Sequence, residues 1–525
     1  MPSTGIQAGP PAGSPIQTTI QTTEVLVVGA GPVGLALAVG LARAGVDCRI
    51  VERDPDFRDR GVRGKGVNPR TLEVLDDLGA AEGILARGLL NPKVRTYQGG
   101  QVVHEVDPAA ANTPTPDRPY AGMVLLAQHH TEAVLRDRLA EHGGKVELGT
   151  ELVDCVPDGD GVLATLRRDC GPLRIRARHV VGCDGGRSTV RKLAGIPFLG
   201  ETWEEERFIM ASMRIDGLAP DRMHIWNDVR FGAGALAIVP LCRDDMWAVH
   251  AAVTPDGDGA LPAPTLDTFR RVFAERAGLP GVTLHDPTWA STWRPTVRMV
   301  ERYRSGRILL AGDAAHCHSA AGGQGMNTGI QDAHNLAWKL AATLRGAPGT
   351  LLDSYEAERL PVARAVLTAT SAQHRTLFAD GGARALADQF VDLTATAGGD
   401  FTGLSVGYRG GPLGRDLDDT TGIRAGDRAP DAPCRTADGP TRLFDLFRGP
   451  HFTLLRFTDR PGPALLPPLP GLRETAVQDP DGHARRAYGL PGDAVVLVRP
   501  DGYVSLTAGT PDTRQLRDHL RQFAL

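Results

Sequence analysis

A glycine-rich turn between a short apolar segment and an alanine-rich segment constrains this chain more than any other feature. Residues 24–28 (EVLVV) predict a buried parallel strand, and an Ala/Leu-rich helix follows the turn to about Arg43. In the turn, Gly29-x-Gly31-x-x-Gly34, the first glycine permits a tight bend and the second lets the backbone approach a pyrophosphate. The third glycine lets helix and strand pack closely. The start of the helix offers unpaired N–H groups and a positive dipole end to phosphate.

The residues after this helix complete a βαβ unit. Gly45 ends the helix, and residues 48–52 (CRIVE) predict a second strand that ends in Glu52. The Glu52 carboxylate can accept hydrogen bonds from both ribose hydroxyls. A glycine-rich turn alone is a weak signal, but together with the strand, the helix and the acid it predicts a dinucleotide site. The motif does not separate FAD from NAD.

A second segment, residues 312–332 (GDAAHCHSAAGGQGMNTGIQD), follows the apolar strand 307–311 and points to a flavin. Asp313, at a strand end, can accept a hydrogen bond from a ribityl hydroxyl. The Gly322–Gly325 run brings bare backbone against a flat ring, and a helix is expected to begin near Met326 or Asn327. Reduced flavin carries negative charge near N1 and O2, which the start of a helix stabilises.

A third motif, Cys183-Asp184-Gly185-Gly186-Arg187-Ser188-x-Val190-Arg191, also follows a predicted strand. Asp184 with Arg187 and Arg191 is able to bridge a pyrophosphate and fix a loop. A salt-bridged turn without ligand is about as common for such a pattern, so both interpretations stay open.

Composition excludes several classes of protein. The 525 residues are 42% hydrophobic and 23% charged with a formal net charge of −4, typical of a globular chain and without a basic surface for nucleic acid or membrane. The 7 cysteines are scattered, with no CxxC pair and no metal-ligand spacing, which indicates a reducing compartment and no metal site. His316 and His318 lack further ligands nearby, so packed or hydrogen-bonded histidines are expected there. Residues 1–22 predict a disordered tail, and we expect a cytoplasmic protein.

Three more segments have distinct patterns. Short alternating strands separated by Gly, Pro and Asp turns predict a sheet over residues 198–298. Long helices are expected over 326–345 and 351–378, and a loop-like linker over about 404–433. Near the C-terminus, residues 495–508 predict a hairpin around Asp501-Gly502.

The three motifs in this order resemble those of the group A flavoprotein monooxygenases, the para-hydroxybenzoate hydroxylase type. Residues 67–73 (VNPRTLE), Gln128 with Glu132, and residues 351–363 (LLDSYEAERLPVA) also have counterparts in that family. The similarity covers about 24–378. Within the family the chain looks closest to the phenol and aromatic polyketide hydroxylases, whose C-terminal thioredoxin-like domain residues 424–525 resemble.

The resemblance implies an α/β fold, α+β overall. A Rossmann-like FAD-binding domain with a helical extension is expected from 23–197 plus 299–403, with a β-rich substrate domain inserted at 198–298. The thioredoxin-like domain, 424–525, has no cysteine after Cys434, so dithiol chemistry is excluded there.

The resemblance also implies the site. Gly29 to Gly34 and Glu52 are expected to hold the ADP half of FAD, Arg63 and Gln128 its phosphates or ribityl chain, and Asp313 with residues 325–327 the ribityl chain and ring. Asp184 and Arg187 serve both FAD and NAD(P)H in the family. The implied cofactor contacts are Gly29, Gly31, Pro32, Val33, Gly34, Glu52, Arg53, Arg63, Gln128, Asp184, Arg187, Asp313, Gly323, Gly325, Met326 and Asn327. Candidate substrate contacts are Trp226, Arg230, Pro240 and Trp293, each weighed against a packing or solvated role.

In members of this family NAD(P)H reduces the flavin, and O2 then forms a C4a-hydroperoxide that an electron-rich ring attacks. The resemblance therefore implies an NAD(P)H- and FAD-dependent monooxygenase acting on an aromatic small molecule, as a monomer or homodimer. Baeyer–Villiger oxidation and epoxidation on the same scaffold remain open, as does a non-catalytic flavoprotein that shelters a pathway intermediate. Residues 319–321 (SAA) depart from the prolines common in the family, and no residue for proton transfer is identified.

Overall fold

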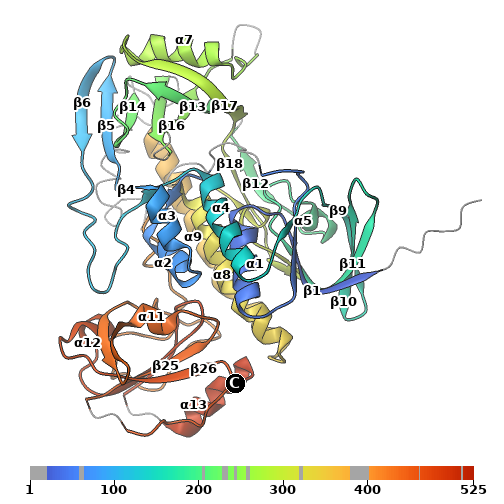
Figure 1. Cartoon of the computed structure of the whole chain (residues 1–525), viewed down its shortest axis with the longest axis vertical. Coiled ribbons are helices and arrows are strands. Elements are labelled where there is room, and N and C mark those ends of the chain that lie inside the picture. Colours follow the sequence, from blue (N-terminus) through green and yellow to red (C-terminus); the bar gives the residue numbers. More distant parts are fainter. Residues whose placement is uncertain are drawn as a thin grey trace, which may run out of the picture.

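The computed structural model arranges the chain in three bodies along its long axis, with the C-terminal residues at one end and a β-rich body at the other (Figure 1). Within the described part, no helix is both long and apolar enough to cross a bilayer. The described residues are 20–57, 64–203, 207–226, 234–241, 245–255, 260–318, 323–378, 401–459, 462–509 and 512–525.

The central body contains an eight-stranded sheet whose main path runs β19-β20-β11-β1-β2-β8. Strand β1 pairs in parallel with β11 and β2, and β11 pairs in parallel with β20. The last residues of three neighbouring strands lie side by side, because Val28 pairs with Gly182 and Gly182 with Leu310. All three sequence motifs therefore begin at one edge of this sheet. Its strands are β1 (Gln21–Val28), β2 (Cys48–Val51), β8 (Val146–Glu147), β9 (Glu151–Asp158), β10 (Gly161–Arg167), β11 (Leu173–Gly182), β19 (Arg304–Ser305) and β20 (Ile308–Leu310).

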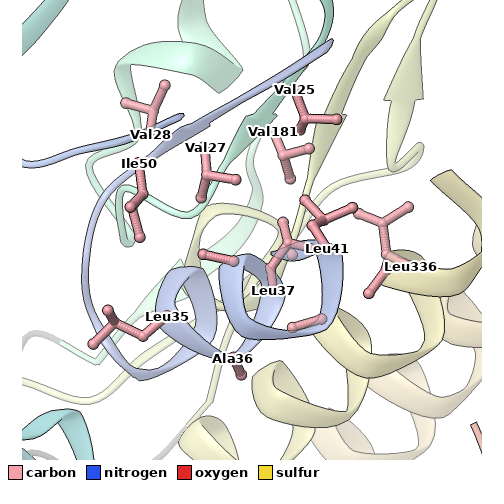
Figure 2. Packing of buried hydrophobic residues seen from close by; sticks show 14 of the residues in the cluster. Val25, Val27, Val28, Leu35, Ala36, Leu37, Leu41, Ile50, Val181 and Leu336 are labelled. Atoms are coloured by element: carbon pink, nitrogen blue, oxygen red, sulfur yellow. The ribbon is translucent and has the colours of Figure 1, made fainter. Parts of the chain in front are cut away.

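Helix α1 (Pro32–Arg43) packs Leu37 and Leu41 against this sheet (Figure 2). Leu37 and Leu41 have no exposed surface, and truncating such a side chain to alanine typically destabilises a fold by about 2–5 kcal/mol. Helix α8 (Gln324–Leu344) crosses α1 closely, since a Cβ on Gly40 would lie 2.8 Å from the Ala337 methyl group. The βαβ unit predicted from the sequence is confirmed.

Shorter elements surround this core. Strand β1 begins at Gln21, so two residues assigned to the disordered tail belong to the sheet instead. Helix α8 begins at Gln324, two residues before the predicted start. The other elements of the central body are β3 (Gly66–Val67), α2 (Pro69–Asp77), α3 (Ala81–Arg87), β4 (Leu89–Leu90), β7 (Val124–Leu125), α4 (Gln128–Glu141), α5 (Thr189–Leu193), β12 (Leu199–Thr202), β18 (Thr296–Met299), η1 (Gly312–Ala314), β21 (His316–Cys317), η3 (Gly349–Leu352) and α9 (Asp353–Phe378).

The β-rich body is a seven-stranded sheet of order β17-β13-β16-β15-β14-β5-β6, with α7 (Leu266–Ala277) on one face. Most of it comes from the segment predicted as an inserted sheet, but β5 and β6 join from earlier in the chain, because β5 pairs in parallel with β14. Two strands of the predicted segment, β12 and β18, pair with each other, and β18 also pairs with β21 of the central body. The strands are β5 (Lys93–Gln98), β6 (Gln101–Val106), β13 (Phe208–Asp216), β14 (Arg222–Trp226), β15 (Leu236–Pro240), β16 (Met246–Ala252) and β17 (Thr283–Trp293).

The C-terminal body contains a mixed five-stranded sheet of order β22-β28-β27-β25-β26. Strands β27 and β28 form the predicted antiparallel hairpin, and Gly502 in its turn has a φ of 75° that favours glycine. Cys434 is buried there, and burial raises the pKa of its thiol to about 12, which keeps it unreactive. The elements are β22 (Arg415–Asp416), β23 (Pro433–Thr436), β24 (Gly439–Arg442), α11 (Leu443–Phe447), β25 (Phe452–Phe457), β26 (Leu472–Val477), α12 (His483–Tyr488), β27 (Ala494–Val498), β28 (Val504–Ala508), α13 (Thr513–Leu520) and η4 (Arg521–Phe523).

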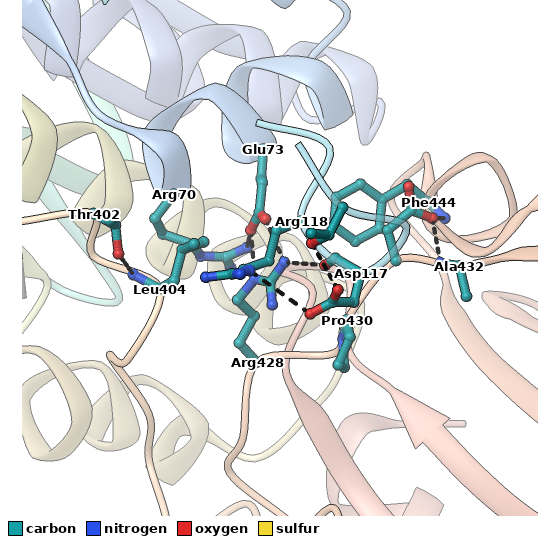
Figure 3. A network of polar contacts seen from close by, with 12 residues as sticks. Arg70, Glu73, Asp117, Arg118, Thr402, Leu404, Arg428, Pro430, Ala432 and Phe444 are labelled. Atoms are coloured by element: carbon teal, nitrogen blue, oxygen red, sulfur yellow. Dashed lines mark hydrogen bonds and ion pairs between the residues drawn. The ribbon is translucent and has the colours of Figure 1, made fainter. Parts of the chain in front are cut away.

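Buried ion pairs join the C-terminal body to the central body (Figure 3). Arg428 donates to the Glu73 carboxylate on α2 at 2.8 Å and to the Asp117 carbonyl at 2.9 Å. Arg499 reaches the Glu358 carboxylate on α9 at 2.6 Å, and both side chains are 1% exposed. Removing one partner of such a pair strands a buried charge, so these contacts fix the C-terminal body in place.

Candidate active site

A cavity of about 1700 Å³ lies between the edge of the central sheet and the seven-stranded sheet. This volume exceeds the range of about 300–1,000 Å³ typical of a pocket for one small ligand, so a cofactor and a second molecule fit together. Most of the cofactor residues expected from the sequence line it: Gly29, Gly31, Pro32, Val33, Glu52, Arg53, Gln128, Asp184, Arg187, Asp313, Gly323, Gly325 and Met326. Arg63 lies outside the described residues.

The three glycines of the first motif have different surroundings. A Cβ on Gly29 would lie 2.5 Å from the Cys183 carbonyl oxygen, and Gly29 has a φ of 102°. A Cβ on Gly34 would lie 2.0 Å from the Gly29 carbonyl oxygen. A Cβ on Gly31 would have no atom of the described residues within 4 Å, because it would project into open space. Gly29 and Gly34 are therefore required by the fold, whereas Gly31 leaves room for a ligand at the start of α1.

The Glu52 side chain folds back onto this turn. Its carboxylate accepts hydrogen bonds from the backbone N–H groups of Ala30 at 3.0 Å and Asp54 at 3.1 Å. A carboxylate has about four lone-pair sites, so Glu52 can accept further hydrogen bonds from a ribose.

In the loop that contains Asp184, the carboxylate of this residue holds the start of α5. It accepts hydrogen bonds from the Ser188 hydroxyl at 2.5 Å and from the backbone N–H of Thr189 at 2.6 Å. Burial raises the pKa of Asp184, although these hydrogen bonds oppose the shift. Arg191 donates to the carbonyl oxygens of Gly186 at 2.8 Å and Ala314 at 2.9 Å. Asp184 and Arg191 thus fix the loop, and Arg187 is an exposed cation at the cavity.

In the loop that contains Asp313, Asp332 of α8 anchors the backbone. It accepts hydrogen bonds from the Gly312 N–H at 3.2 Å and from the Arg359 Nε at 2.7 Å, and pairs with His316 Nε2 at 2.7 Å. Burial opposes ionisation of Asp332, but Arg359 and His316 outweigh it and lower the pKa of this carboxyl. His316 has the hydrogen-bonded role expected from the sequence.

The start of α8 is fixed by Asn327. Its side-chain amide donates to the carbonyl oxygens of Gly66 at 2.9 Å and Gly323 at 2.8 Å, and its oxygen accepts from the Asn68 N–H at 3.0 Å. Asn327 is completely buried and is not among the described residues that line the cavity, unlike its neighbour Met326. It therefore positions the loop that presents Gly323 and Gly325 to the cavity.

The candidate substrate residues separate into two groups. Trp293 lines the cavity and has its ring centroid 5.5 Å from that of Phe208. Trp226 is 2% exposed, stacks on Tyr97 at 4.6 Å, and donates its indole N–H to the Ala277 carbonyl oxygen at 3.2 Å. The structure therefore gives Trp226 a packing role in place of the substrate contact.

Of the two further candidates, Pro240 belongs to the described part of the chain. Pro240 is buried at the end of β15 and does not line the cavity, although Val239 beside it does. Arg230 lies outside the described residues, as does the departure at residues 319–321.

Sequence reasoning missed one polar pair on the cavity wall. Lys65 Nζ lies 2.8 Å from His250 Nε2, and both residues line the cavity. Burial lowers the pKa of Lys65 to about 8, and burial with the nearby Lys65 lowers the pKa of His250 well below its ordinary value. The two residues are far apart in the chain and belong to no motif, but His250 is a polar residue in an apolar strand, MWAVHAA, which is a usable signal.

The cavity suits an FAD. The open space at Gly31, the first turns of α1 and α8 and the acids at strand ends match the groups of a dinucleotide with a flavin ring. Among the described residues, no group of three or more His, Cys, Asp or Glu side chains is placed to hold a metal ion.

Comparisons with known proteins agree with this geometry. Residues 22–370 match the family described as FAD binding domain, and residues 423–524 match the family described as Aromatic-ring hydroxylase, C-terminal. The chain belongs to the FAD-binding aromatic-ring hydroxylases.

Relatives within this hydroxylase family align over nearly the whole chain. A flavin-dependent monooxygenase of Mycobacteroides abscessus is 40% identical over 92% of this chain and 96% of its own length. A 6-methylpretetramide 4-monooxygenase of Streptomyces rimosus is 34% identical over 96% of this chain and 94% of its own. The crystal structure of aklavinone-11 hydroxylase with FAD and aklavinone superposes with a TM-score of 0.78 at 28% identity, covering 96% of this chain and 99% of the other. The hydroxylase described here is an FAD-dependent monooxygenase, which confirms the resemblance inferred from the three motifs.

Proposed function

We propose that this chain is an NAD(P)H- and FAD-dependent monooxygenase that inserts one oxygen atom into an electron-rich aromatic substrate of the phenolic or polyketide type. The observation that carries the proposal is the single cavity that joins the three nucleotide-binding loops to an apolar sheet wall. The names of the relatives, which include a 6-methylpretetramide 4-monooxygenase, an anhydrotetracycline 6-monooxygenase and an aklavinone-11 hydroxylase, support the substrate class.

We assign the cofactor residues as follows. Gly31 and the first turn of α1 bind the pyrophosphate, and Glu52 binds the ribose of the ADP half. Asp313 binds the ribityl chain, and the backbone of Gly323 and Gly325 lies against the ring. Arg187, in the loop that contains Asp184, is the cation that binds FAD phosphate or NAD(P)H. When bound, FAD supplies the electron transfer and oxygen chemistry that no side chain provides.

The protein's own contribution is to orient the substrate ring and to exclude water. Apolar side chains of the seven-stranded sheet line the cavity, among them Phe208, Met210, Met223, Ile225, Ala237 and Val239. Their surface lowers the local dielectric and keeps water from the reacting atoms. Trp293, at the end of β17, adds an aromatic face for the substrate.

The test is a panel of phenols and hydroxylated polycyclic quinones offered to the purified yellow protein. We expect at least one compound to accelerate NADPH or NADH oxidation and to gain one oxygen atom by mass spectrometry, with the new hydroxyl on the ring by NMR. Product in which oxygen has entered a ring C–C bond, or an epoxide, would assign the alternative reactions on the same scaffold. If no compound accelerates reduction and none is oxygenated, the sheltering flavoprotein is the better account.

The proposal also covers the cellular compartment and the oligomeric state of the enzyme. We infer a cytoplasmic enzyme that works as a monomer or homodimer and binds no nucleic acid, because the net charge is −4 and the cysteines lack a disulfide pattern. Gel filtration with light scattering distinguishes the two assembly states.

A further inference from the structure

In the part of the cavity wall formed by the seven-stranded sheet, apolar side chains surround the imidazole of His250. His250 on β16 pairs with Met210 on β13 and with Ala237 on β15, and all three side chains line the cavity. A polar group in such a wall loses hydration and is retained where it has a partner or a ligand. Its partner within the protein is the ammonium group of Lys65, at 2.8 Å.

The backbone around Lys65 is tied to the loops assigned to the flavin. The Gly64 N–H donates to the Gln128 side chain at 3.1 Å, and the Lys65 carbonyl oxygen accepts from the Leu126 N–H at 2.8 Å. The Gly66 carbonyl oxygen accepts from Asn327 at the start of α8 at 2.9 Å. From this anchored backbone the Lys65 side chain crosses to β16. Its Nζ therefore lies where the wall assigned to the flavin meets the wall assigned to the substrate.

The hydrogen-bond partner of Lys65 is the neutral imidazole of His250, whereas a lysine removed from solvent usually pairs with a carboxylate. Within the described part of the chain no Asp or Glu pairs with Lys65, and burial alone accounts for its lowered pKa. His250 stays uncharged at neutral pH because burial and the adjacent Lys65 lower its pKa. A half-buried cation without a carboxylate partner in an otherwise apolar wall complements an anion, or a neutral group that becomes one by giving up a proton.

We propose that Lys65 and His250 form the subsite for an ionisable hydroxyl of the substrate, so that the substrate is a phenol or enol held as its anion against Lys65. This inference rests on the proposed function and names the substrate class of the same site. In the step, the substrate O–H bond breaks and its proton passes to solvent water, while Lys65 stays an ammonium, so the oxyanion binds beside a cation that is already charged at neutral pH. The ammonium donates one hydrogen bond to His250 Nε2 and one to the oxyanion.

The consequence for the reaction is activation of the ring. An oxyanion donates electron density into the ring positions ortho and para to it, and those carbons attack an electrophilic oxygen. Lys65 touches the substrate in this arrangement. His250 acts through Lys65, so it is a positioning residue.

The experiment measures binding to the FAD-loaded enzyme at pH 7, with alizarin and emodin as hydroxylated probes and their O-methyl ethers as matched ligands. The visible spectrum of these quinones reports ionisation of the hydroxyl directly. We expect the wild type to bind at least one hydroxylated probe in its anionic form, and about 10- to 100-fold more tightly than its ether, the range for a hydrogen bond to a charged group. Lys65→Met is expected to lose both the anionic spectrum and the preference.

Two further variants keep the interpretation specific. Lys93→Met removes a half-exposed lysine on β5, outside the cavity lining, and is expected to bind like the wild type. His250→Phe is expected to weaken the anionic spectrum, and His250→Gln to restore part of it, because the amide oxygen again accepts from Lys65. Purified variants are compared only after their FAD content is shown to match the wild type.

Several results would overturn the subsite. A wild type that binds neither probe, or that fails to distinguish a probe from its ether, contradicts it, as does a Lys65→Met enzyme that keeps the anionic spectrum. Failure of the proposed function looks different, because the wild type then yields no oxygenated product from any compound of the panel. If the wild type oxygenates a phenol and Lys65→Met does so at the same rate, the function stands and the subsite falls.

Discussion

One added methyl group is expected to have opposite effects at Gly31 and at Gly34 of the first motif. At Gly31 it weakens FAD binding, and at Gly34 it lowers the stability of the apoprotein. Gly31 has φ −73° and ψ −177°, a conformation open to alanine, and its Cβ would project into the open cavity. We expect Gly31→Ala to change the stability of the apoprotein by less than about 1 kcal/mol, the scale of an exposed cap substitution. The same methyl group enters the space assigned to the pyrophosphate, so FAD affinity is expected to fall at least about tenfold, which is about 1.4 kcal/mol.

Gly34→Ala is the matched variant with the reverse pattern. Its Cβ would lie 2.0 Å from the Gly29 carbonyl oxygen, far inside ordinary contact distance, so α1 must move away from the turn. Overpacking of this kind destabilises a fold by about 1–3 kcal/mol or more, and the loss is expected in the apoprotein itself.

Urea unfolding of both apoproteins and fluorescence titration with FAD measure the two quantities separately. A Gly31→Ala protein that binds FAD like the wild type would refute the assignment of the pyrophosphate to this turn. A Gly34→Ala apoprotein as stable as the wild type would refute the steric argument.

Three other predictions concern the flavin site, a buried ion pair and a buried histidine. Asp313→Ala is expected to lose FAD on gel filtration or to be reduced more slowly by NADPH in stopped-flow, and a fully yellow variant with normal turnover would contradict the assignment. Arg499→Met leaves the buried Asp501 carboxylate without its cationic partner and Glu358 with Lys339 alone, and is expected to destabilise the chain by about 3–5 kcal/mol in urea, whereas Arg409→Met at an exposed pair has little effect. Burial lowers the pKa of His224 to about 4, so the unfolded state binds more protons between pH 6.5 and 4 and stability falls as the pH drops through that window. His224→Gln should remove about 2 kcal/mol of the loss between pH 8 and pH 5, and an unchanged pH dependence would contradict this.

The nucleotide-binding half of the fold was predictable because its signals are local. The strand before Gly29, the helix after it and the acid at Glu52 lie within one βαβ unit, where spacing determines geometry. The three motif loops meet because each follows a parallel strand, and such strands end at the same edge of a sheet.

The substrate half was less predictable because its contacts are distant in the chain. Strand β5 pairs with β14 more than a hundred residues later, and nothing in either segment specifies this partner. Trp226 looked available for a substrate, but a sequence does not reveal that Tyr97 and α7 enclose it. Lys65 and His250 meet only in the folded chain, so no spacing rule identifies them.

The attachment of the C-terminal body shows the same limit. The hairpin around Asp501 was visible as turn chemistry, but its role as an anchor was not. Asp501 accepts from the Trp338 indole N–H at 2.9 Å, and its carbonyl oxygen accepts from Arg70 at 2.9 Å. These contacts join elements from three separate regions of the chain, and each depends on burial that only the assembled fold provides.

The origin of the oxygen atom in the product tests most directly whether this protein is a flavin-dependent aromatic hydroxylase. The purified enzyme is incubated with NADPH, a hydroxylated aromatic substrate from the panel and ¹⁸O₂, and the product is analysed by mass spectrometry and NMR. We expect one ¹⁸O atom per product, on a ring carbon ortho or para to the ionisable hydroxyl, with one NADPH consumed for each coupled turnover. Oxygen derived from water, or a product formed without NADPH, would contradict this expectation.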